Sequence, residues 1–260
     1  MPARITLRGL TFEAELPMKP HLPRPVLVVL AIAALAACSQ QNDQSAADAA
    51  RQQAQAQAAE AAKQLDNYRQ LVRIHNDEMA VAMGHTILER YPGSAAAQEV
   101  QQSLPGIEAR YKADLEKRRL AALWLYQVSP MAGGTQSTAS LNSLLPSGNN
   151  AIRLVLRRHN QWGQSVFLFG TGHGFSCKGT ICTIPATFDG KPHPLKAYLP
   201  QTGEPAIFIK DDDAFIAALA KTGKIDMQPT LKDGGQQEVI FETGGFDASK
   251  WAAVPKGKKK

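Results

Sequence analysis

The distribution of glycine divides this chain of 260 residues into two parts. Four of its 20 glycines lie in residues 1–130, and the other 16 follow. Glycine is unfavourable inside helices, whereas short strands joined by tight turns use it often. The sequence therefore predicts an α+β protein, with an N-terminal helical stalk and hairpin followed by an antiparallel β-sandwich that contains one short helix.

The N-terminal region has the pattern of an export signal. Residues 26–37 are twelve consecutive apolar residues. This run is too short to cross roughly 30 Å of hydrocarbon, but it has the length of a signal-peptide core. Lys19 and Arg24 supply the basic flank that such signals carry. We expect residues 1–37 to be a signal peptide, with Met18 as the true start.

The apolar run ends in Leu35-Ala36-Ala37-Cys38. These four residues resemble the lipobox of bacterial lipoproteins, in which the cysteine is acylated and becomes the new N-terminus. The resemblance implies a lipid on Cys38, and Ser39 after it implies sorting to the outer membrane, on the periplasmic side. The alternative is a short anchor helix that is never cleaved, with Cys38 incidental.

The other two cysteines, Cys177 and Cys182, remain as a pair once Cys38 is lipidated. In an oxidising compartment a structural disulfide is the default for such a pair. A redox-active pair more often has two intervening residues, and here there are four. A metal site that adds His173 lacks a fourth ligand at a recognised spacing, so we expect no metal.

Residues 38–64 form the expected lipidated N-terminus and an Ala/Gln spacer. No large apolar side chain occurs from residue 40 to 63, so this stretch is either an exposed helical stalk or a flexible linker. From Leu65 the apolar residues recur at spacings of three and four, which predicts a helix. Unbroken from Ser45 to Arg90, this helix would be on the order of 70 Å long.

Residues 65–126 are predicted to form a helical hairpin. Pro92-Gly93 ends its first helix, and Pro105-Gly106 is expected to break or kink the second. Residues 82–97 resemble part of a tetratricopeptide repeat, with a helix–Tyr-Pro-Gly-Ser–helix junction. One visible unit does not make an array, and an ordinary capped helix pair remains the alternative.

Residues 127–254 are predicted to form the β-sandwich, before a basic tail at 255–260. Apolar and polar residues alternate at 152–157, whereas 165–169 is apolar on both faces and is therefore expected to be a central strand. Three aspartates, 211–213, precede a short amphipathic helix. We expect them to cap that helix and not to bind calcium.

Nothing in the sequence indicates an enzyme or a cofactor. The loop Gly170–Gly174 lacks the third glycine of a dinucleotide fingerprint, because Phe175 stands in its place. His75 and His85 are ten residues apart, and His159 and His193 are expected to stand alone in loops.

The charge distribution argues against nucleic acid as a partner. After removal of residues 1–37 the net charge is +4 (25 basic minus 21 acidic), and four of the positive charges lie in residues 256–260. The rest of the exported chain is therefore neutral overall.

From Trp124 onward the order of features resembles the type VI secretion accessory family called VasI. The similar features include a tryptophan-led first strand, a strand ending in Arg157-Arg158, a Phe188-Asp-Gly turn, and a final Phe241-Glu-Thr-Gly-Gly-Phe246 segment. The resemblance covers about half the chain. It implies a β-sandwich with an accessory role in secretion and brings no catalytic residues.

Together these features predict a non-enzymatic lipoprotein anchored in the outer membrane. Its predicted function is to bind an envelope protein as an accessory scaffold, in an assembly that the resemblance relates to secretion. The alternative hypothesis is an inhibitor of a lysozyme-like cell-wall hydrolase, which would present the loop Gly170–Gly174 with His173 to an active-site cleft.

Overall fold

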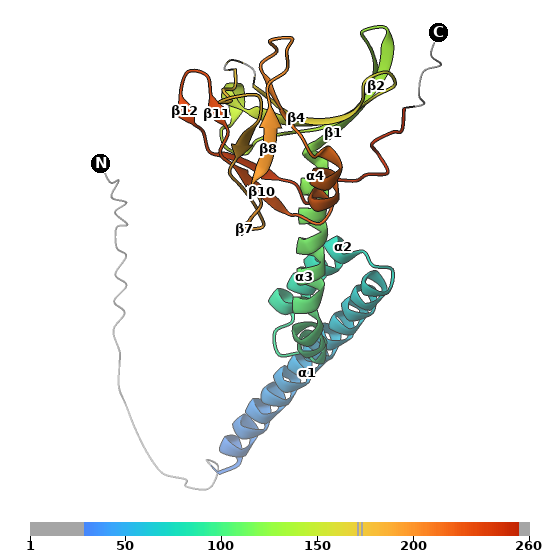
Figure 1. The fold of residues 1–260 in the computed structure, drawn as a ribbon. Helices are drawn as coiled ribbons and strands as arrows, with labels where there is room; N and C mark the ends of the chain where they lie inside the picture. The colour runs from blue at the N-terminus through green and yellow to red at the C-terminus, as the bar shows by residue number, and fades with distance from the viewer. Residues whose placement is uncertain (1–28, 171, 173, 255–260) are drawn as a thin grey trace, which may run out of the picture.

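The computed structural model describes residues 29–170, 172 and 174–254, with residues 29–43 described as backbone. Three helices come first: α1 (Val29–Arg73), α2 (Asp77–Arg90) and α3 (Ala95–Ala122). A β-rich region follows, and α3 leads directly into it (Figure 1). The predicted α+β class is confirmed.

The first helix ends at Arg73, and not at Arg90 as the sequence predicted, because the chain turns at residues 74–76. His75 adopts a left-handed backbone conformation with φ of 55°, and the N–H groups of His75 and Asn76 donate to the carbonyls of Val72 and Leu71. This is the bonding pattern of a Schellman motif, which ends a helix. Asn76 then caps α2, since its side chain accepts a hydrogen bond from the N–H of Met79.

The second correction concerns Pro105, which does not break its helix. Helix α3 runs through Pro105 and Gly106 to Ala122. A proline inside a helix costs about 3 kcal/mol. Leu104 and Ile107 on either side are buried, so packing against the other helices offsets this cost.

The three helices share a small core of their own. Its buried members come from the second half of α1, from α2 and from the first half of α3. Gly84 allows α2 to approach α3 closely, because a Cβ at this position would lie 2.8 Å from Leu104 Cδ1. The Tyr68 hydroxyl is 2.8 Å from Ser103 Oγ and links α1 to α3. The predicted hairpin is therefore a three-helix bundle.

The N-terminal part of α1 extends beyond this bundle (Figure 1). All side chains from residue 44 to 60 are exposed, and Ala61 is the first buried one. The spacer is thus helical, and its residues 44–60 bury no side chain against the other helices. Among the described residues, no helix is both long enough and apolar enough to cross a membrane.

The β-rich region is built from antiparallel strands in a seven-stranded sheet of order β1-β2-β3-β4-β9-β8-β5, a four-stranded sheet of order β13-β10-β6-β7, and a two-stranded hairpin of β11 and β12. A short helix, α4 (Asp212–Leu219), follows β9. The strands are β1 (Trp124–Met131), β2 (Gly134–Asn142), β3 (Ile152–His159), β4 (Gly163–Gly170), β5 (Cys182–Ile184), β6 (Ala186–Phe188), β7 (Lys191–Pro192), β8 (Leu195–Tyr198), β9 (Ala206–Ile209), β10 (Lys224–Met227), β11 (Thr230–Leu231), β12 (Gly235–Gln236) and β13 (Val239–Glu242).

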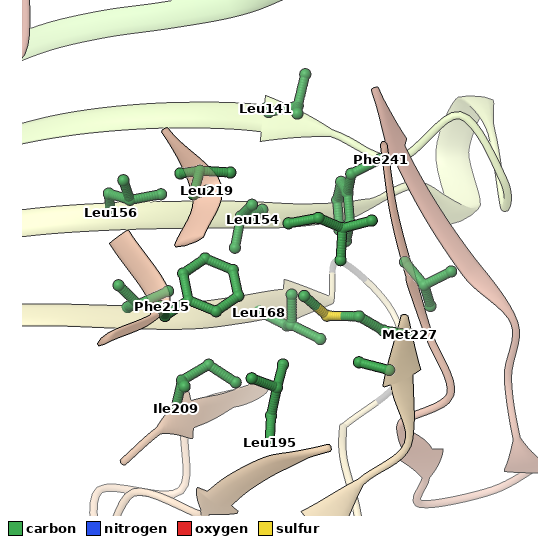
Figure 2. Close-up of a cluster of buried hydrophobic side chains, with 14 of the residues drawn as sticks. Leu141, Leu154, Leu156, Leu168, Leu195, Ile209, Phe215, Leu219, Met227 and Phe241 are labelled. Carbon is green, nitrogen blue, oxygen red and sulfur yellow. The ribbon is translucent and has the colours of Figure 1, made fainter. Parts of the chain in front are cut away.

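One hydrophobic core joins the two larger sheets and α4. In Figure 2, Leu154 and Leu168 of the seven-stranded sheet lie near Phe215 of α4, Met227 of β10 and Phe241 of β13. One face of the seven-stranded sheet is therefore covered by the four-stranded sheet and α4. This is the predicted sandwich, with β4 as the central strand that the sequence indicated.

The boundary between the two parts lies earlier than predicted. Strand β1 begins at Trp124, so residues 124–126 belong to the sheet and not to the helical hairpin. Trp124 is buried in the β core, where its ring lies 5.0 Å from that of Phe246. The chain after β13 returns to this corner, and Trp251 is buried there as well.

Candidate binding surface on the seven-stranded sheet

The second face of the seven-stranded sheet, here called the outer face, carries a row of cross-strand partners. The row is aromatic on β4, β9 and β8, and this part is called the aromatic row. Cross-strand partners place the row's members side by side over six strands. In order across the sheet they are Leu125, Ser140, Val155, Phe167, Phe208 and Tyr198. The rings of Phe167 and Phe208 lie 4.8 Å apart, and those of Phe208 and Tyr198 lie 5.6 Å apart. Stacked rings in neighbouring strands make a continuous apolar strip.

The outer face is separate from the core. Side chains alternate along a strand, so Val166 and Leu168 point into the core while Phe167 points the other way. Val155 and Phe208 are buried, yet they are not members of the core cluster. Tyr198 and Leu125 remain 38% and 51% exposed. In the part of the chain that the structure describes, both layers that pack on this sheet pack on its other face.

Arg157 lies at the centre of this surface. Its guanidinium carbon is 5.1 Å from the ring centre of Phe167, 5.8 Å from that of Phe208 and 5.3 Å from that of Trp162. Its Nε donates a hydrogen bond of 3.1 Å to Ser165 Oγ. Burial among these groups lowers the pKa of the Arg157 guanidinium from its usual value. The described residues give Arg157 no carboxylate in ion-pair contact.

Trp162 is fixed beside Arg157 by a buried histidine. His159 is 3% exposed, and its ring stacks on Trp162 with 3.9 Å between ring centres. His159 Nδ1 accepts hydrogen bonds from the backbone N–H groups of Gln161 and Trp162, while Nε2 lies 3.0 Å from the Met131 carbonyl. The prediction that His159 stands alone in a loop is wrong, because it ends β3 and holds the β3–β4 turn.

The charged side chains on the strands of the seven-stranded sheet are all basic. None of its seven strands contains Asp or Glu, whereas Arg153, Arg157 and Lys196 all belong to the outer face. Arg153 donates to Asn142 Oδ1 and Lys196 to Thr183 Oγ1, so neither is paired with an acid through these bonds. The outer face therefore combines an apolar strip with positive charge, which suits a protein partner better than a small substrate.

A cavity of about 290 Å³ lies at the end of β3 and β4. Its lining includes Ile152, Gly170, Gly172 and Leu231, so it adjoins the predicted inhibitory loop. Residues 171 and 173 lie outside the described residues. The arrangement of His173, and with it the inhibitor hypothesis, stays a prediction.

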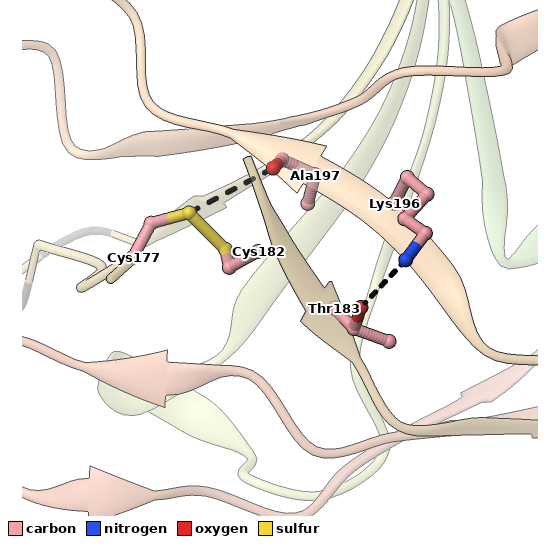
Figure 3. Close-up of a disulfide and its surroundings, with 5 residues drawn as sticks. All are labelled: Cys177, Cys182, Thr183, Lys196 and Ala197. Carbon is pink, nitrogen blue, oxygen red and sulfur yellow. Dashed lines mark hydrogen bonds between the residues drawn. A yellow bond between two sulfur atoms is a disulfide. The ribbon is translucent and has the colours of Figure 1, made fainter. Parts of the chain in front are cut away.

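Cys177 and Cys182 form a disulfide, with their Cα atoms 5.5 Å apart. The bond ties the loop before β5 to β5 itself, and Cys177 Sγ lies 3.7 Å from the Ala197 carbonyl oxygen of β8 (Figure 3). Lys196 bonds to Thr183 beside it. The pair thus secures the short edge strand of the seven-stranded sheet and lies away from Arg157.

The remaining predicted sites fall partly outside the described residues. Cys38 lies within α1, but its side chain is outside them, as are most of the signal peptide and the basic tail 255–260. Asp211 is the N-cap residue of α4, although its side chain makes no capping bond. Asp212 and Asp213 occupy the first turn and accept hydrogen bonds from Gln164. Within 29–170, 172 and 174–254, no group of three His, Cys, Asp or Glu residues is arranged to hold a metal.

Comparison with known proteins adds no relative. No family model, no curated protein and no solved structure matches the chain.

The outer face was missed by sequence reasoning, although part of its pattern was visible. The run 165–169 was recognised as apolar on both faces, and Arg153 and Arg157 as the polar side of their strand. What joins them is the long-range pairing of β4 with β9 and of β9 with β8. Such pairing brings Phe208 and Tyr198 alongside Phe167, and it is not encoded in local periodicity.

Proposed function

We propose that the protein is a lipoprotein, anchored in the outer membrane through Cys38, that binds another envelope protein in the periplasm. In this proposal α1 is the spacer and the β-sandwich is the binding module. The protein performs no catalysis and serves as an accessory scaffold in an envelope assembly, with secretion as the assembly that the VasI resemblance suggests.

One observation carries the binding role: the uncovered outer face with Arg157 at its centre. Val155 and Phe208 are buried within this face, and Leu125, Trp162 and Tyr198 are exposed on it. Exposed apolar side chains that are grouped on one face and rimmed by polar groups are characteristic of interaction sites. Arginine and aromatic residues are also the side chains most enriched where protein partners bind tightly. Phe167, Phe208, Tyr198 and Trp162 supply the rings here.

The fold supports the proposed roles of α1 as the spacer and of the β-sandwich as the binding module. Helix α3 packs against the chain that follows β13, and β13 belongs to the four-stranded sheet. The outer face lies on the other side of the seven-stranded sheet and is therefore directed away from the layer that α3 contacts. The exposed segment 44–60 alone would span about 25 Å as a helix. A partner at some distance from the membrane would thus be within reach.

The binding role is tested by site-specific photo-crosslinking in intact cells. A photo-reactive amino acid replaces Tyr198 on the outer face in one variant and Ala217 on the exposed side of α4 in another. We expect a discrete protein adduct from position 198 and none from position 217. Equal labelling at both positions, or no adduct at 198, would contradict the proposal.

The anchor is tested separately by metabolic labelling with a radioactive fatty acid. Cys38→Ser should abolish incorporation of the label, whereas the neighbouring Ser39→Ala should retain it. Labelling of Cys38→Ser at the level of the unmodified chain would contradict lipid attachment at this residue.

A further inference from the structure

The guanidinium of Arg157 has unused bonding capacity. An arginine side chain carries five N–H donors in a planar fork. Within the described residues only Nε has a hydrogen-bond acceptor, which is Ser165 Oγ. The two terminal nitrogens lack one, while the rings of Trp162, Phe167 and Phe208 exclude water from the sides. A carboxylate that accepts hydrogen bonds from both terminal nitrogens would stabilise this partly desolvated cation.

The charges farther from Arg157 on the outer face also favour an anionic partner. The seven strands contain no acidic side chain. The charge of Glu204, in the loop before β9, acts on the guanidinium, but among the described residues Glu204 forms no ion pair with it. Arg153 lies four residues before Arg157 on the same face of β3, which corresponds to about 13 Å along a strand. Lys196 adds a further positive charge on β8. Two or more carboxylates along one bound segment would therefore find cations on this face.

The aromatic row supplies the apolar half of the site. Phe167 and Phe208 lie next to the guanidinium, and Tyr198 continues the row from β9 onto β8. Apolar side chains that flank a carboxylate would cover these rings and exclude water from the ion pair. Lower local dielectric strengthens such a pair.

We propose that the outer face recognises an acidic segment of the partner protein, with an Asp or Glu side chain paired to Arg157 and apolar neighbours on the aromatic row. This inference rests on the proposed function and specifies the chemistry of its partner.

The inference is tested with peptides on the full chain purified in detergent. The probe is a short fluorescent peptide that alternates glutamate and phenylalanine and has an amidated C-terminus. We expect it to bind, with an affinity that falls as salt is added. A glutamine–phenylalanine peptide of the same length should not bind, with either an amidated or a free C-terminus. Binding of the free-acid glutamine peptide alone would assign Arg157 to a C-terminal carboxylate and overturn the proposal.

Three variants locate the binding at Arg157. Arg157→Gln should weaken binding of the glutamate peptide about tenfold or more, because it removes the charge. Arg157→Lys should have an intermediate effect, because it keeps the charge and loses the fork. Lys221→Gln, a cation just after α4, should bind like the unmodified chain. Circular dichroism shows whether each variant is folded, and unchanged binding by a folded Arg157→Gln would overturn the inference.

Two further results separate this inference from the proposed function. Binding to phosphatidylglycerol vesicles through Arg157, without binding to the glutamate peptide, would assign the face to a lipid surface and overturn the inference. A photo-adduct at position 198 that persists in Arg157→Gln would overturn the inference and leave the proposed binding role intact. Absence of any adduct at position 198 would contradict both the inference and the proposed binding role.

Discussion

Gly245 lies directly against the backbone of Leu120, at the last turn of α3. A Cβ on Gly245 would overlap the Leu120 carbonyl group and the Ala121 nitrogen. Beside this contact Arg119 of α3 forms ion pairs with Glu116 and with Glu242 of β13. The end of the helical bundle is therefore fastened to the β-sandwich by a close backbone contact and by charge.

The Gly245 contact predicts an effect of adding one methyl group. Gly245→Ala forces α3 and the following chain apart, and overpacking of this kind costs about 1–3 kcal/mol. Urea denaturation should show a lower free energy of unfolding. The matched control is Gly234→Ala, where a Cβ meets no atom within 4 Å. Equal stability of the two variants would show that the contact between α3 and the sandwich is not tight.

Trp251 is predicted to fasten the C-terminal segment to the sandwich. Its ring is 2% exposed, its Nε1 donates to the Ser137 carbonyl at 3.1 Å, and the Arg158 guanidinium lies 3.7 Å from the ring centre. Trp251→Ala should cost about 3–5 kcal/mol. Thermal unfolding should show a much smaller loss for Trp162→Ala, whose ring is half exposed. A Trp251 variant as stable as the Trp162 variant would contradict this assignment.

The disulfide is predicted to stabilise the fold modestly. Cys177 and Cys182 are five positions apart, and closing so short a loop contributes about 2 kcal/mol in the chain-entropy account. Adding a reductant should lower the unfolding temperature while far-UV circular dichroism at ambient temperature is retained. The double variant Cys177→Ser/Cys182→Ser should not respond to the reductant. A response in that variant would show that the shift has another cause.

The helical bundle should lose stability in acid through Asp77. The Arg110 side chain, which bonds Asp77 at 2.8 and 3.0 Å, holds the pKa of that carboxyl below its usual value of 3.8. A carboxyl whose folded-state pKa is lowered stabilises the fold above its unfolded pKa. The contribution should therefore be complete above pH 3.8 and fall as the pH drops through the lower folded value.

Urea denaturation measured at several pH values tests this prediction. Asp77→Asn and Arg110→Gln should each lower stability at neutral pH and flatten the acid dependence, and the double variant should resemble either single one. Additive effects of the two substitutions would show that Asp77 and Arg110 do not act as a pair.

Local sequence patterns predicted most elements and failed where tertiary packing or unusual residues decide. The alternation at 152–157 and the turn at Asp189-Gly190 were readable because strands and turns follow local rules. The end of α1 was missed because His75, and not glycine, occupies the left-handed position. The predicted break at Pro105 does not occur, because the burial of Leu104 and Ile107 offsets its cost.

The candidate site was less predictable than the fold. Arg157 was recognisable only as a polar residue on a half-buried strand. Its rings come from Trp162, Phe167 and Phe208, and Phe208 is brought close by the pairing of β4 with β9. The 40 residues between the two phenylalanines carry no local indication of that pairing.

Recovery of the partner from cells tests the central claim most directly. The partner identified from its adduct at position 198 is then quantified after chemical crosslinking and purification of three chains: the unmodified chain, Trp162→Ser/Tyr198→Ser, and Ile181→Ser. All three substituted side chains are at least 38% exposed, so folding should be preserved. We predict that the outer-face variant loses the partner about tenfold or more and that Ile181→Ser retains it. Equal recovery by all three chains would contradict the assignment of the outer face as the binding surface.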